Sequence, residues 1–81
     1  MNEKNIIMNS NEQELINKIN ELSLISILKY KKGLSLKFIV NYILNEKYYG
    51  LSEEYDIDIL MILKYQKHLT YDEIYSAISK D

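Results

Sequence analysis

Apolar residues recur every three or four positions along most of the chain, which is the spacing of one face of a helix. Ser10 precedes the first stripe, and Gln13 follows it by three residues, a pairing typical of a helix start. We therefore predict a helix that runs from there to Lys32, or that restarts at Ser23. The stripe itself consists of Leu15, Ile16, Ile19, Leu22, Ile25 and Leu28.

Gly33 and Ser35 separate this stripe from a second one. A glycine after a lysine-rich turn favours a helix end, because glycine adopts the left-handed conformation without strain. Ser35 is suited to cap the helix that follows. The second stripe consists of Leu36, Ile39, Val40, Ile43 and Leu44, and Gly50 closes the region. The two predicted helices form a hairpin over approximately residues 11–46.

Two more helices are predicted behind Ser52 and Thr70. The third helix has Glu53, Glu54 and Asp56 in its first turn, where the helix dipole favours acids. It is apolar almost all round over residues 57–63, so we predict that it is the most buried element. Thr70 and Glu73 form a second helix-start signal. The stripe of the last helix, which we expect to face the preceding helix, consists of Tyr71, Ile74, Tyr75 and Ile78.

The segment ILKYKKGLSLKFIVNYI, residues 27–43, resembles ILKYQKHLTYDEIYSAI, residues 62–78. Eight of the seventeen aligned positions are identical. The alignment places His68 where the first copy has Gly33, which predicts a turn residue in the left-handed conformation rather than a base or a ligand. We therefore predict an all-α, compact four-helix domain built from two similar helix-turn-helix hairpins, approximately 11–46 and 52–80. It forms a single domain over residues 10–81, after a frayed N-terminus over residues 1–9.

Composition limits the chemistry that the chain can perform. It has no cysteine and a single histidine, so we predict no disulfide, no metal site and no cofactor. Catalytic carboxylates need a pocket that shifts their pKa values, and no motif indicates one, so we expect no catalytic residue and no enzyme. Asn, Ile, Lys and Tyr, whose codons are AT-rich, are abundant and arginine is absent, which indicates an AT-rich genome. Without a signal-peptide core or a membrane-length apolar run, we expect a cytoplasmic protein.

Charge is distributed unevenly along the chain. Residues 22–47 hold five lysines against one glutamate, a balance of +4, whereas residues 48–81 hold three lysines against seven acids, a balance of −4. Opposite charges on two regions can steer two copies of one chain together. Because the apolar content also exceeds what one small core needs, we expect a homodimer.

The eight tyrosines favour a protein-binding function, because tyrosine buries a large area at low entropic cost. The residues expected to contact the partner are Tyr48, Tyr49, Tyr55, Glu54 and Asp58. We predict a small non-enzymatic regulatory or inhibitory protein. We expect it to be encoded by a phage or mobile element and to act in the host cytoplasm, for example as an anti-defence inhibitor.

The alternative is a helix-turn-helix DNA-binding transcriptional regulator that uses the lysine-rich segment 29–37. Its candidate phosphate contacts are Lys29, Lys31, Lys32 and Lys37. Three observations oppose it. The chain lacks arginine, the commonest reader of guanine; its net charge is −2; and Leu36, Phe38 and Ile39 stand where a base-reading helix shows polar residues.

Overall fold

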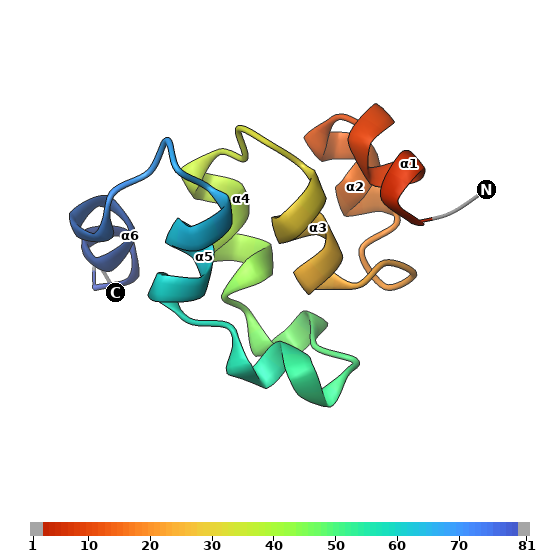
Figure 1. Ribbon diagram of the computed structural model, residues 1–81. Coiled ribbons are helices and arrows are strands. Elements are labelled where there is room, and N and C mark those ends of the chain that lie inside the picture. The colour runs from red at the N-terminus through yellow and green to blue at the C-terminus, as the bar shows by residue number, and fades with distance from the viewer. Residues whose placement is uncertain (1–2, 80–81) are drawn as a thin grey trace.

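The computed structural model describes residues 3–79 and is all-α, as predicted: these residues form nine helical segments and no strand (Figure 1). The segments are α1 (Glu3–Asn9), α2 (Glu12–Asn17), α3 (Leu24–Tyr30), α4 (Leu36–Phe38), η1 (Ile39–Ile43), η2 (Glu46–Tyr48), η3 (Ser52–Asp56), α5 (Ile59–Tyr65) and α6 (Tyr71–Ile78). They form an elongated body of 37 × 24 × 20 Å, with α1 and α6 at opposite ends (Figure 1). The predicted division into four helices is therefore too coarse.

The N-terminal segment is ordered as a helix, so the expectation of a frayed end over residues 1–9 is wrong for the residues that the structure describes. Ile7 is fully buried, and α1 packs against α3. The predicted helix start at Ser10 is also displaced by one residue. Asn11 caps α2 by accepting from the amide of Glu14, whose carboxylate accepts in return from the amide of Asn11. The Ser10 hydroxyl instead donates to a carbonyl one turn earlier in α1.

The first predicted helix is interrupted at residues 18–22, and α3 begins after Ser23, whose hydroxyl accepts from the amide of Ser26. The restart at Ser23, one of the two predicted possibilities, is thus correct. Gly33 follows α3 with φ of +71°, and the hydroxyl of Ser35 accepts from the amide of Phe38 to cap α4. Both turn predictions are confirmed. Beyond α4 the chain widens into the π-helix η1, in which the amide of Leu44 donates to the Ile39 carbonyl.

The third predicted helix is divided in two. The 3₁₀-helix η3 ends at Asp56, and α5 begins only after Asp58, whose carboxylate accepts from the amide of Met61. The prediction that this region is the most buried is wrong. Ile62 is the one residue of α5 that is fully buried, and Leu60 is 69% exposed. The most buried helix is α3, whose buried residues are Leu24, Ile27 and Leu28.

The offset of 35 residues that aligns the two sequence copies also aligns their helices. It places both ends of α3 on both ends of α5, and the first residue of α4 on the first residue of α6. The turns differ, however. Among the described residues Gly33 alone has a positive φ, so the predicted left-handed conformation of His68 is wrong, although His68 does lie in a turn.

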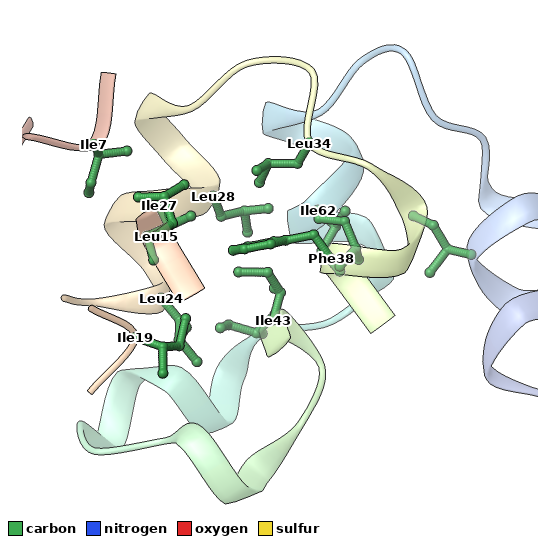
Figure 2. Packing of buried hydrophobic residues seen from close by; sticks show 13 residues of the cluster. Ile7, Leu15, Ile19, Leu24, Ile27, Leu28, Leu34, Phe38, Ile43 and Ile62 are labelled. Atoms are coloured by element: carbon green, nitrogen blue, oxygen red, sulfur yellow. The ribbon is translucent and has the colours of Figure 1, made fainter. Parts of the chain in front are cut away.

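A single cluster of apolar side chains joins the helices. Figure 2 shows Phe38 pointing into its middle, with Leu28 of α3 and Ile62 of α5 beside it. The buried members are Ile7, Leu15, Ile19, Leu24, Ile27, Leu28, Leu34, Phe38, Ile39, Ile43, Ile57, Ile62 and Ile74. Phe38 and Ile39, which the sequence analysis counted against a base-reading helix, are core residues. No helix in residues 3–79 is long and apolar enough to cross a membrane.

Candidate functional site

A cleft of about 480 Å³ lies between the turn that follows α2 and the segment that joins η2 to η3. Residues 19–23 form one wall and residues 47–51 the other, with Glu3 and Glu54 completing the lining. Three of the predicted partner-binding residues, Tyr48, Tyr49 and Glu54, line this cleft. We call it the tyrosine cleft.

Contacts within the protein hold both tyrosines of the cleft in place. The hydroxyl of Tyr49 donates to the Ile43 carbonyl over 2.9 Å, and its ring meets the Tyr55 ring edge-on at 5.0 Å between centroids. The Tyr48 ring lies 5.2 Å from the ring of Tyr42. Burial, followed by the nearby carboxylates of Glu46 and Glu54, raises the pKa of Tyr49. Internal contacts therefore hold this wall in place, and the phenol of Tyr49 is neutral near neutral pH.

Glu54 lies at the cleft lining but acts mainly as an internal support. The residue is only 2% exposed. Its Oε2 accepts from the amide of Leu24 at 2.7 Å, and its Oε1 accepts from the amides of Gly50 and Leu51 at 2.6 and 2.9 Å. One carboxylate therefore caps the first turn of α3 and fixes the loop that carries Leu51. With its oxygens occupied, Glu54 is not available to a partner in the way that the sequence suggested.

The other predicted partner residues have different positions. Asp58 does not share a helix face with Glu54, because the chain leaves η3 before Asp58 caps α5. Tyr55 is 61% exposed, and Leu51, which sequence reasoning did not select, is half-exposed at the cleft lip. Tyr55 does not line the cleft itself but packs its ring against that of Tyr49, which does. Two large exposed apolar residues therefore lie beside two fixed tyrosine rings, and we call these four residues the rim of the cleft.

The candidate phosphate contacts lie near the two hairpin turns. Lys29, Lys32 and Lys37 are exposed, and Lys31 is half-buried. The second turn lies against the first, because Nε2 of His68 is 2.8 Å from the Leu34 carbonyl oxygen. Lys67 and His68 thereby join Lys32 around a hollow of about 440 Å³, together with Gly33 and Tyr65. Sequence reasoning missed these two residues because they belong to the other copy of the repeat.

A buried glutamine fixes the relation between the two turns. Gln66 is 1% exposed, and its Oε1 accepts from the amide of Leu34 over 3.1 Å. Its Nε2 donates to the carbonyls of Leu28 and Lys31 at 2.8 and 2.7 Å, at the last turn of α3. Gln66 therefore satisfies carbonyls that the end of a helix leaves without partners.

The predicted stripe on α6 is mostly outside the core. Ile74 is fully buried, but Tyr71, Tyr75 and Ile78 are exposed, and the two tyrosine rings stack on each other at 6.1 Å. The expectation that all four residues pack inward is wrong. Residues 3–79 contain no group of three or more histidine, aspartate or glutamate side chains that could hold a metal ion.

Comparisons of the chain with protein-family models, with curated proteins and with solved structures found no match.

Proposed function

We propose that the chain is a small regulatory or inhibitory protein, without enzymatic activity, that binds another protein through the rim of the tyrosine cleft. The observation that carries this proposal is the exposure of Leu51 and Tyr55 beside the fixed rings of Tyr48 and Tyr49. Rigid aromatic side chains next to exposed apolar ones are the composition of interface hot spots, because little conformational entropy is lost on binding.

The source and location of this activity form part of the same proposal. The abundance of residues with AT-rich codons and the small size suit a phage or mobile-element protein that acts in the host cytoplasm, for example an inhibitor of a defence system. We further propose that the working form is a homodimer.

The test is capture of a partner from the native host, followed by measurement of its affinity with purified components. We expect the double variant Leu51→Ser, Tyr55→Ser to weaken binding by roughly tenfold or more, as for hot-spot truncations. The matched control is Met8→Ser on α1, which removes a similarly exposed apolar residue that does not line the cleft. An equal effect of the two changes, or none, would refute the cleft as the binding surface.

Nucleic-acid binding remains the second candidate, because the two turns bring Lys67 and His68 next to Lys32. Binding through phosphates requires affinity for a duplex that falls steeply with salt. We expect Lys31→Ala with Lys32→Ala, and separately Lys67→Ala, to reduce both affinity and salt slope. Absence of duplex binding at low salt excludes this candidate.

A further inference from the structure

Helix α6 carries more apolar residues than the rest of the protein covers. Tyr71, Tyr75 and Ile78 are spaced four and three residues apart and so share one side of the helix, adjacent to Ile74. Of these four residues Ile74 alone is buried, while Tyr75 is 56% exposed. Figure 1 shows α6 at one end of the molecule, where the body does not cover its outer side.

So little burial is unusual for a helix that must be stable. Helix α6 has eight residues, and isolated helices of that length do not persist in water. Its start is secured by Thr70, which accepts from the amide of Glu73, but one fully buried side chain supplies most of its anchoring. A further apolar surface would bury the exposed residues of α6 and strengthen the helix, and a second copy of the chain can supply it.

The charges next to the stripe indicate how two copies fit. Helix α6 exposes Asp72 and Glu73, and its described residues carry no cation, so α6 against α6 would bring no opposite charges together. The outer side of α5 carries the positive charge that α6 lacks. Leu60 is its most exposed apolar residue, and the exposed Lys64 lies one turn further along the same face.

We propose that two copies associate about a two-fold axis, with α6 of each copy lying across the outer face of α5 of the other. Tyr71, Tyr75 and Ile78 then cover the partner's Leu60, and Asp72 faces the partner's Lys64. Each contact occurs twice, so the assembly closes as a dimer rather than extending as a fibre. This arrangement rests on the proposed homodimer, names its surface, and leaves the tyrosine cleft free for another protein.

Sedimentation equilibrium of the full chain over a range of micromolar concentrations tests the proposal. We expect a dimer whose dissociation constant rises at least tenfold in Tyr75→Ser, as for loss of an interface aromatic. The matched control is Tyr55→Ser, which removes an equally exposed tyrosine at the tyrosine cleft and leaves dimerisation unchanged. Far-ultraviolet circular dichroism confirms that each variant keeps its helix content.

Charge reversal tests the orientation of the two copies. Asp72→Lys and Lys64→Glu each weaken the dimer, and the two changes in one chain restore it towards the wild-type dissociation constant. A dimer that is indifferent to Tyr75→Ser, or a double variant that is no better than either single one, overturns the surface but not the homodimer. A chain that is monomeric throughout overturns both, while binding of another protein at the tyrosine cleft is unaffected by that result.

Discussion

Glu54 provides the most direct test of how this fold is held together. Its carboxylate is buried and accepts three amide hydrogen bonds, one from the first turn of α3 and two from the loop at residues 50–51. In Glu54→Gln one acceptor oxygen is replaced by an NH₂ group, which cannot accept a bond from an amide. The substitution preserves the size of the side chain, so packing is not the variable.

The cost follows from which amides lose their acceptor. Hydrogen bonds to charged groups contribute about 1.5–3 kcal/mol each, and a buried amide without a partner costs about 1–3 kcal/mol. Gly50 and Leu51 are exposed, so water can replace their bonds, whereas Leu24 is fully buried and its amide depends on Glu54. We therefore expect Glu54→Gln to lower the free energy of unfolding by about 2–4 kcal/mol. A domain of this length has only about 4–12 kcal/mol in total.

Thermal and urea denaturation, followed by circular dichroism, measure this loss. For a small domain about 1 kcal/mol corresponds to a shift in melting temperature of about 4–8 °C, so the expected shift exceeds roughly 8 °C. The neighbouring Glu53 is exposed, so Glu53→Gln removes the same charge at the same place in the sequence. We expect it to change stability by no more than about 0.5 kcal/mol. Equal midpoints for the two variants would refute the role assigned to the buried carboxylate.

Three further predictions concern the turns and the cleft. Gly33→Ala should destabilise the protein by about 1 kcal/mol in urea denaturation, because φ is +71° at this position. Gly50→Ala is the control and should be nearly neutral. Neither added Cβ meets another atom within 4 Å, so the two variants differ in backbone conformation and not in steric fit. In the same assay, Gln66→Ala should lower the free energy of unfolding by about 2–4 kcal/mol, and Lys67→Ala, at an exposed position, by less than about 0.5 kcal/mol. Similar losses for the two variants would contradict the role of Gln66 in capping α3. The pKa of Tyr49 is raised above its ordinary 10.0, so Tyr49 ionises first in the unfolded chain, and the free energy of unfolding falls as pH rises beyond 10.0. Because Tyr49→Phe has no phenol at this position, it should lose less stability over that range. Alkaline titration of the circular dichroism signal measures the difference.

Local signals explain which parts of the fold were predictable. The cap at Ser35, the left-handed Gly33 and the capping box of Thr70 with Glu73 depend on residues within four positions of one another, and all three are present. The start of α2 was misplaced because Ser10 and Asn11 both offer a capping oxygen, and the two competing pairs differ by one position. Sequence alone gives no reason to prefer Asn11.

Long-range contacts explain the rest. The amphipathic pattern cannot tell that α3 is sandwiched between other elements while α5 has an open side, because both have similar apolar content. Likewise, an acidic first turn is an adequate local explanation for Glu54, and nothing nearby reveals that its oxygens reach Leu24, thirty residues earlier. The predicted partner-binding set therefore includes a side chain, that of Glu54, whose carboxylate the fold uses internally.

The repeat shows how two similar hairpins can form one domain. Most of the apolar residues that the copies share lie in the core, among them Ile27, Ile39 and Ile74. Two of the positions at which the copies differ join the hairpins: Gln66, aligned with Lys31, closes the end of α3, and His68, aligned with Gly33, contacts the carbonyl of Leu34. Two identical turns could not form this contact, because one turn must supply the side chain and the other the backbone carbonyl. The contact between the turns therefore explains why the two copies diverge there. The surfaces that we propose for binding lie elsewhere, in the unrepeated segment around Tyr49 and Tyr55 and on the uncovered side of α6.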